Sequence, residues 1–180
     1  GPMRALLVSA ALMLGACASA GAAQAQTPGD SAHPVLGDPN APWRTQTGAS
    51  AADVETARAC LARGDNCENL FQTPCLNAYD EDEGSPALAR RCEWHAMAVW
   101  EDVILAILAD LRRQYGSDGV TKLNDDERTW EASMLDDVGL GMDMYEGGSL
   151  AGPVGAHIRA RATAQRAAYL YEIQQMMSGE

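Results

Sequence analysis

The stretch from Ser85 to Gly116 constrains the fold more than any other part of this chain. Ser85 is a good helix N-cap, Pro86 suits the first helical position, and Gly116 is a residue that can end the helix. Between them an apolar residue recurs every three or four positions: Cys92, Ala96, Val99, Val103, Ile107, Leu111 and Tyr115. At 1.5 Å per residue such a helix is about 45 Å long. Its apolar stripe must be buried against other elements.

Two later segments have the same periodicity. Asn124 and Glu127 form an N-terminal capping pattern, and Gly147-Gly148 ends the helix that we predict from there. Its inner face, which we expect in the core, contains Trp130, Met134, Val138, Met142 and Tyr145. A last helix is predicted to start near Pro153. Its inner face contains Val154, Ile158, Ala162, Gln165, Tyr169, Ile173 and Met176.

A shorter helix precedes these three. Ser50 and Asp53 approximate a capping box, and Gly64 can end the helix after Arg63. We expect residues 65–84 to be an irregular, cross-linked segment. Sustained period-two alternation is missing from the sequence. The predicted fold class is therefore all-α, an antiparallel bundle of three long helices plus a short disulfide-clipped N-terminal helix.

The first 25 residues are interpreted as a tag remnant, Gly1-Pro2, followed by a signal peptide. The basic Arg4 precedes an apolar run from Ala5 to Ala16. This run is shorter than the roughly 20 apolar residues that a membrane-spanning helix needs. We therefore predict that the chain is exported.

Two ways of processing this signal remain open. Leu14-Gly15-Ala16-Cys17 resembles the bacterial lipobox, in which Cys17 becomes lipidated. Ordinary signal peptidase would instead cut after small-residue sites such as Ala18-Ser19-Ala20 or Ala23-Gln24-Ala25. We favour the lipobox because Cys17 directly follows the apolar run. Ala18 is not the Asp that often retains lipoproteins at the inner membrane, so the expected address is the outer membrane.

Residues 26–49 are rich in Pro, Gly, Ser, Thr and Ala. A segment with so few large apolar residues is predicted to be a flexible tether, apart from Trp43, which we expect to dock locally at most. The folded domain is accordingly predicted to cover residues 50–180.

Four cysteines lie beyond the signal: Cys60, Cys67, Cys75 and Cys92. An even number in an exported chain indicates two disulfides. Their spacings contain no CxxC pair, which argues against a zinc site.

The chain is acidic, with a net charge of −12 that becomes −13 without Arg4. Such a surface repels nucleic acid, so no nucleic-acid partner is expected, and it attracts basic proteins. The alternative interpretation is that the acidity only keeps an exported protein soluble.

Catalysis is not predicted. The chain has His33, His95 and His157, but no GxSxG, P-loop, dinucleotide or HExxH motif. The pairs Asp125-Asp126 and Asp136-Asp137 are adjacent on helices, so their carboxylates point in different directions. We expect no enzyme activity and no cofactor.

A metal site is not predicted either. The acidic run from Tyr79 to Gly84 resembles part of a calcium-binding loop. It lacks a third ligand before Gly84, and Arg91 stands where a bidentate Glu is needed. We interpret it as a solvated loop.

Several features occur in order along the second half of the chain. Cys75 precedes a long helix that begins with Cys92 and has the Leu-rich run ending at Tyr115. Leu123 and Trp130 follow, then Tyr145-Glu146-Gly147-Gly148-Ser149 and a last helix with Thr163, Gln165-Arg166 and Leu170. In this order they resemble the lysozyme inhibitor LprI-like family of small exported bacterial proteins. The resemblance covers about Cys75 to Ile173. It implies a periplasmic location and lysozyme inhibition.

The chain also departs from this pattern. Similar proteins usually have an Arg-Asp pair and a Cys after the Trp, where this chain has Met134, Leu135 and about Val138. Another Cys usually stands near His157, and this chain instead has Cys60 and Cys67. Sequence proximity and these paired losses favour bridges Cys60–Cys67 and Cys75–Cys92. Four cysteines allow three connectivities, so the pairing stays open.

Two functions are therefore considered. The first is an envelope binding protein that captures a basic partner such as lysozyme, with Tyr145, Glu146, Gly147, Gly148 and Ser149 as the contacting loop. Glycines allow close backbone approach, although this loop could equally be an ordinary helix–helix turn. The second is a non-catalytic structural or assembly accessory of the cell envelope. Either would act in the periplasm, as an outer-membrane lipoprotein if Cys17 is modified.

Overall fold

The computed structural model describes residues 36–79 and 85–179, in which all regular structure is helical. The predicted all-α class is therefore confirmed. The elements are α1 (Pro42–Thr45), α2 (Ala51–Arg63), α3 (Gln72–Asn77), α4 (Pro86–Gln114), α5 (Ser117–Asp143) and α6 (Ala151–Ser178). The predictions of a signal peptide and of lipidation at Cys17 lie outside the described residues.

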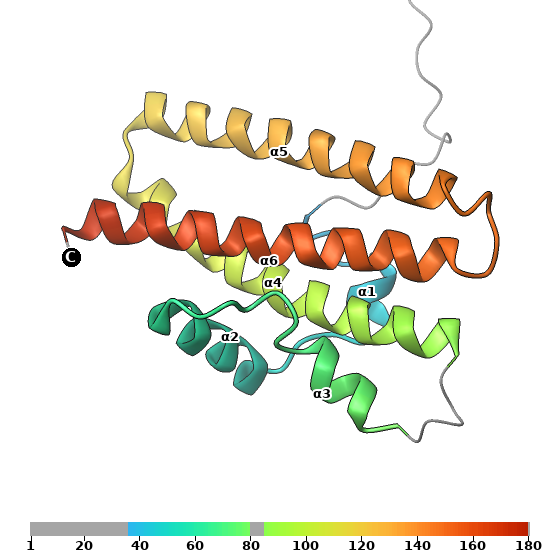
Figure 1. Ribbon diagram of the computed structural model, residues 1–180. Coiled ribbons are helices and arrows are strands. Elements are labelled where there is room, and N and C mark those ends of the chain that lie inside the picture. Colours follow the sequence, from blue (N-terminus) through green and yellow to red (C-terminus); the bar gives the residue numbers. More distant parts are fainter. Residues whose placement is uncertain (1–35, 80–84, 180) are drawn as a thin grey trace, which may run out of the picture. The chain divides into compact units, whose positions relative to one another are not determined.

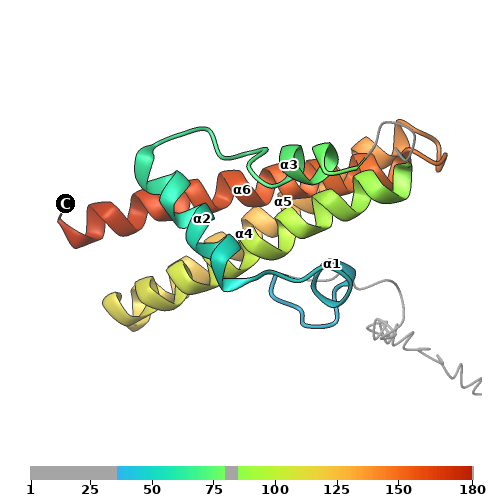
Figure 2. The same cartoon turned by 90° about the horizontal axis from the view of Figure 1, so that it is seen from below.

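Helix α4 forms the centre of the core. The short helices α1, α2 and α3 each pack on it, and α6 packs along most of its length (Figures 1 and 2). Its buried residues are therefore not confined to the predicted stripe, because Met97, Trp100, Ile104 and Leu108 are also buried. Ser85 caps the helix through a hydrogen bond from Leu88 N–H to its Oγ, 3.2 Å long.

Helix α6 lies beside both α4 and α5, whereas α4 and α5 touch little (Figure 1). The face that α6 buries contains mainly small residues: Ala151, Gly155, Ala156, Ala160, Thr163, Ala164, Ala167 and Leu170. The predicted inner face was wrong at Gln165, Tyr169 and Met176, which are exposed. Its other members, Val154, Ile158, Ala162 and Ile173, are partly buried. Helix α4 buries large side chains, among them Trp100 and Ile104. The facing surface of α6 must then be small to keep the interior densely packed.

Helix α5 begins at Ser117, after an N-cap at Gly116, and the predicted start at Asn124 was wrong. The two residues that formed the capping pattern make tertiary contacts instead. Asn124 accepts hydrogen bonds from Arg112, and Glu127 accepts one from Arg166. A side chain that binds another helix is not available as a cap, so α5 runs through this position.

The apolar stripe of α5 is only partly buried. Met134 is buried, Trp130 and Val138 are partly buried, and Met142 and Tyr145 are exposed. The expectation that all five lie in the core was therefore wrong for its C-terminal end. Helix α6 is the main neighbour of α5 among the described helices, and one neighbouring helix cannot bury the whole stripe.

Residues 36–49, which we call the N-terminal segment, belong to the fold. Trp43 is only 5% exposed, and the guanidinium carbon of Arg159 lies 4.2 Å from its ring centroid. Arg44 forms ion pairs with Glu101 at 3.2 Å and with Asp102 at 2.8 Å. The predicted tether was therefore wrong for residues 36–49. One tryptophan and one arginine bind α4 strongly enough to order a segment whose composition is that of a linker.

Disulfides join Cys60 to Cys67 and Cys75 to Cys92, which are the favoured pairs. The first links the end of α2 to the loop after it, and the second links α3 to α4. The disulfide that reaches the long helices therefore holds α3, not α2. Residues 65–84 were expected to be irregular, but they include helix α3. In the described part of the chain, the helices are too short or too polar to cross a membrane.

Candidate partner-binding surface

The turn between α5 and α6 protrudes from one end of the molecule. We call residues 144–150 the α5–α6 loop; it contains all five predicted contact residues, Tyr145 to Ser149, and every one of them is exposed. Two short hydrogen-bonded turns shape it, from Gly148 N–H to Tyr145 O at 2.8 Å and from Ala151 N–H to Gly148 O at 3.0 Å. The loop is thus a defined projection with its side chains directed outward.

The backbone of this loop is left-handed at two successive residues. Glu146 has φ +48° and Gly147 has φ +70°. The position of Gly147 favours glycine, because a side chain is strained there although no atom lies within 4 Å of an added Cβ. Helix α6 begins at Ala151 after an N-cap at Leu150, which makes no side-chain capping bond.

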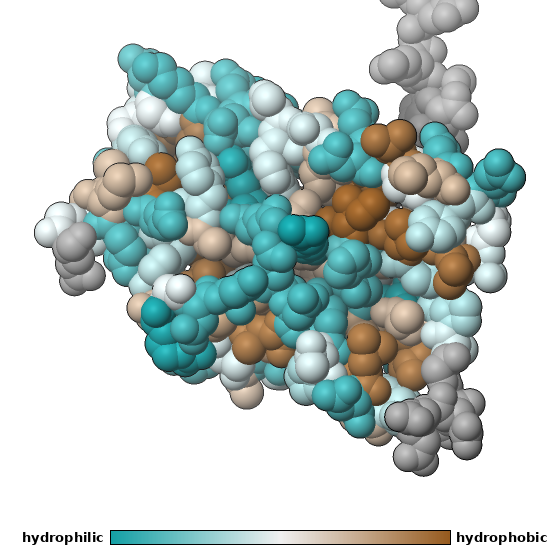
Figure 3. Space-filling view, viewed as in Figure 1, coloured by the Kyte–Doolittle hydropathy of each residue, from teal (hydrophilic) through white to brown (hydrophobic). Residues whose placement is uncertain are grey.

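Apolar side chains are exposed on and beside this loop. Met144 is 76% exposed, Tyr145 45% and Leu150 51%, and Leu140 is 65% exposed at the end of α5. Figure 3 shows apolar surface between α5 and α6 on the side of their loop. Single exposed apolar residues are ordinary, but a group of them beside a projecting loop is typical of an interaction surface.

Negative charge is concentrated on the same element. Residues 117–149 contain nine acidic and two basic residues, a net charge of −7 out of −12 for the chain. Residues 129–156 contain five acidic residues and neither Lys nor Arg. The loop end of α5 is therefore both apolar and acidic, with no basic residue of its own to compensate.

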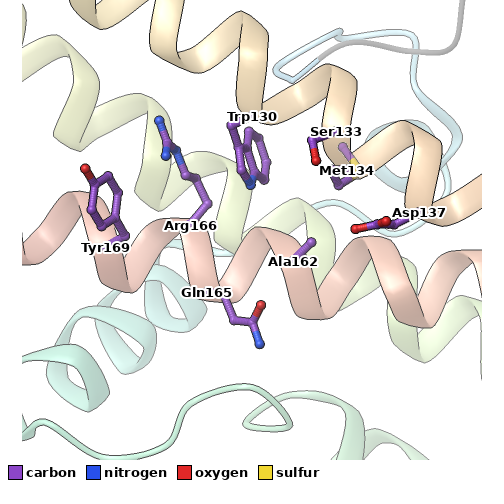
Figure 4. A pocket seen from close by; sticks show the side chains of 8 residues that line it. All are labelled: Trp130, Ser133, Met134, Asp137, Ala162, Gln165, Arg166 and Tyr169. Atoms are coloured by element: carbon purple, nitrogen blue, oxygen red, sulfur yellow. The ribbon is translucent and has the colours of Figure 1, made fainter.

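A pocket opens on the seam between α5 and α6, on the N-terminal side of the loop end of α5 (Figure 4). We call it the seam pocket; its volume is about 280 Å³, and it is lined by Trp130, Ser133, Met134, Asp137, Ala162, Gln165, Arg166 and Tyr169. Met134 forms a buried part of the lining, while Ser133, Asp137, Gln165 and Tyr169 are exposed. The sequence predicted Trp130 and Met134 as core residues and missed the pocket.

Arg166 is the positively charged residue of this pocket, and two carboxylates of the protein neutralise it. It forms ion pairs with Asp126 at 2.5 Å and with Glu127. Burial alone would lower the pKa of Arg166, but the hydrogen bonds from these carboxylates hold it above its ordinary value. Burial raises the pKa of Glu127, and the bond from Arg166 opposes this rise. The guanidinium also lies over two rings, 5.5 Å from the centroid of Trp130 and 5.0 Å from that of Tyr169.

The two described histidines have structural partners. His157 Nδ1 lies 2.9 Å from Glu93 Oε1, and Gln72 donates to the other oxygen of that carboxylate at 3.0 Å. His95 Nδ1 lies 3.2 Å from Gly48 O. Each ring therefore links α4 to another part of the chain.

The predicted carboxylate pairs also separate, since Asp125 binds Arg128 and Asp126 binds Arg166. Among residues 36–79 and 85–179, no three His, Cys, Asp or Glu side chains form a metal-binding group. The acidic residues 80–84 of the calcium-like run lie outside the described residues.

Comparisons of this chain with protein-family models, with curated proteins and with solved structures found no match.

Proposed function

We propose that this chain is an exported binding protein of the bacterial envelope that inhibits a basic lysozyme by occluding its cleft. The α5–α6 loop is the element that enters the cleft. One observation carries the proposal: exposed apolar side chains and uncompensated negative charge occur together on a single projecting loop and the helix before it. The resemblance to the LprI-like family supports lysozyme as the partner.

The chemistry of the loop suits this role. A substrate cleft is concave and narrow, so the blocking element must project and its backbone must approach closely. Gly147 has no side chain, and the direction of its missing Cβ is open space. Tyr145 and Met144 provide apolar contact area on the same projection. Tyr is favoured at interfaces because one side chain offers both an apolar ring and a hydroxyl.

The rest of the molecule acts as a scaffold. In this proposal α4, α5 and α6 form an antiparallel bundle that holds the loop at one end, while the disulfide Cys75–Cys92 and the N-terminal segment brace α4. The bridges are of the kind that form in an oxidising compartment such as the periplasm. Lipidation of Cys17 would place the protein at the outer membrane, where an incoming lysozyme arrives.

The negative charge of α5 and the apolar contacts of the loop should affect different rates, association and dissociation respectively. The negative field of α5 speeds encounters with a basic protein, and that field is largely screened beyond about 8 Å at physiological salt. Rising salt should therefore slow association, while dissociation changes less. Apolar contacts of the loop should set the dissociation rate.

The test is a binding assay and a cell-wall-lysis assay of the purified protein with chicken-type and bacterial-type lysozymes. Met144→Ala and Tyr145→Ala should each speed dissociation about tenfold if the side chain is buried in the complex. Met176→Ala is the matched control, because Met176 is also a methionine, 69% exposed, near the C-terminal end of α6.

Two results would reject the proposal. The first is no binding to any lysozyme at micromolar concentration and low salt. The second is binding that Met176→Ala weakens as much as Met144→Ala does, since the loop would then have no special role.

A further inference from the structure

We infer that the seam pocket is a receptor for one cationic side chain, a lysine or arginine of the partner protein. This inference rests on the proposed function, because it names a second contact for the same basic partner. It concerns a different part of the surface, and it does not depend on lysozyme being that partner.

The indole of Trp130 has Arg166 on one side and borders the cavity on the other. Figure 4 shows Arg166 between Tyr169 and Trp130, while Ser133, Met134 and Asp137 lie on the other side of the indole. Arg166 therefore already uses one side of Trp130 for a cation–π contact. The other side borders the cavity, and a ring face of this kind attracts a second cation.

The charge of the pocket also favours a cation. Arg166 is matched by two carboxylates, those of Asp126 and Glu127. Asp137 lines the cavity as well and is exposed. Arg166 and the carboxylates of Asp126, Glu127 and Asp137 together have a net charge of −2 when ionised. This charge would repel an anion, and a bound cation would partly neutralise it. Arg166 cannot recruit an anion, because its own carboxylates already bind it.

The polar groups beside Asp137 fit the donors of such a side chain. Ser133 and Gln165 line the same cavity and each contributes a side-chain oxygen that can accept a hydrogen bond. A guanidinium or ammonium group offers only donors. The cavity of about 280 Å³ is slightly below the range, from about 300 Å³, of sites for drug-sized ligands. It therefore suits a single side chain.

The pocket and the loop can serve one partner. Asp137 and Tyr145 are eight positions apart, which corresponds to about 12 Å along a helix. A standard interface buries about 800 Å² on each partner, which is a patch roughly 30 Å across. A basic protein seated on the loop would thus also cover the pocket.

The first experiment uses the full chain and N-acetyl-arginine amide as the probe. The indole N–H signal of Trp130, assigned with Trp130→Phe, is followed by NMR during the titration. We expect a saturable shift, with binding about threefold weaker in Asp137→Asn, as for a partly exposed ion pair. Asp136→Asn is the control, because Asp136 has the same charge and is exposed but does not line the pocket.

The inference is overturned if the Trp130 signal shows no saturable shift, or if Asp136→Asn and Asp137→Asn weaken binding equally. N-acetyl-glutamine amide, which is neutral, should give no saturable shift, and an equal response to it would also overturn the inference. These readouts need no lysozyme.

The second experiment measures dissociation of the lysozyme complex. Asp137→Asn should speed dissociation about threefold more than Asp136→Asn does, while both slow association equally because they remove the same charge. An intact Trp130 response without any lysozyme binding would reject the proposed partner and support the cation receptor. Lysozyme binding that is indifferent to Asp137→Asn would overturn the role of the pocket in capture.

Discussion

Arg166 Nε on α6 donates a hydrogen bond to Glu127 Oε1 on α5, 2.9 Å away, and the two residues are only 8% and 9% exposed. This is a buried ionic link between α5 and α6. Ion pairs of this kind cost much when one partner is lost, because the other charge stays buried and unpaired.

We expect Arg166→Met to lower the free energy of unfolding by about 3 kcal/mol, since Glu127 would lose its main cation. The double variant Arg166→Met with Glu127→Leu should recover most of this loss. Urea unfolding of the single and double variants measures both effects. If the double variant were less stable than Arg166→Met, the loss in the single variant would not be due to an unpaired Glu127. The ion pair itself would then stabilise the fold.

The pH dependence of stability should reflect Glu101. Burial raises the pKa of Glu101 above the ordinary 4.5, although Arg44 opposes the shift. The folded protein then holds this proton more tightly than the unfolded chain does. The stability that Glu101 contributes is complete below pH 4.5 and is lost as the pH rises through its folded pKa.

Glu101→Gln removes this titration, so only the unmodified protein loses this stability as the pH rises. The free energy of unfolding of the variant, relative to that of the unmodified protein, should therefore rise between about pH 4 and pH 7. Urea unfolding at both pH values measures the difference. The exposed Glu55 provides the control variant Glu55→Gln, for which we expect no such trend. A relative stability of Glu101→Gln that falls with pH would contradict the raised pKa.

Trp43 should contribute more to the stability of the fold than Trp130, whereas the sequence predicted Trp130 to be the core residue. Trp43 is buried, so Trp43→Ala should cost about 3–5 kcal/mol, as large core truncations do. Trp130 is only partly buried, and Trp130→Ala should cost about half as much. Urea midpoints of the two variants decide the matter. A larger loss for Trp130→Ala than for Trp43→Ala would contradict the order expected from their burial.

The disulfide Cys75–Cys92 joins two residues that are 17 positions apart in the sequence. Its replacement by Cys75→Ser with Cys92→Ser should lower the free energy of unfolding by about 3 kcal/mol, because the unfolded chain regains the entropy of that loop. Non-reducing peptide mapping should find this bridge and Cys60–Cys67. A Cys60–Cys92 peptide would contradict the pairing.

The glycines near the end of α5 should respond differently to alanine. Gly139 has no atom within 4 Å of an added Cβ, so Gly139→Ala should gain up to about 1 kcal/mol of helix propensity. At Gly141 the added Cβ would clash with Ile158 Cδ1, and that side chain would have to move. Thermal unfolding should therefore show a smaller gain, or a loss, for Gly141→Ala. Equal gains would show that Ile158 repacks freely.

Local physics in the sequence determined the helices. The pattern around Ser85 and Pro86 and the capping box of Ser50 and Asp53 predicted helix starts that the structure has. Gly64, in the left-handed conformation, ends α2 as expected. These signals were sufficient because capping and periodicity depend only on residues within a few positions of each other. The exposed glycine turn after α5 could be located for the same reason.

Only the tertiary structure decided which face each helix buries and which polar residues meet. Asn124 and Glu127 had the spacing of a cap, yet Arg112 and Arg166 on other helices bind them. Trp43 lies in a segment with the composition of a linker, and it packs against Arg159, which is more than a hundred positions away. The seam pocket likewise combines residues of two helices. Contacts between distant residues follow from how whole surfaces pack, and no local window of sequence contains that information.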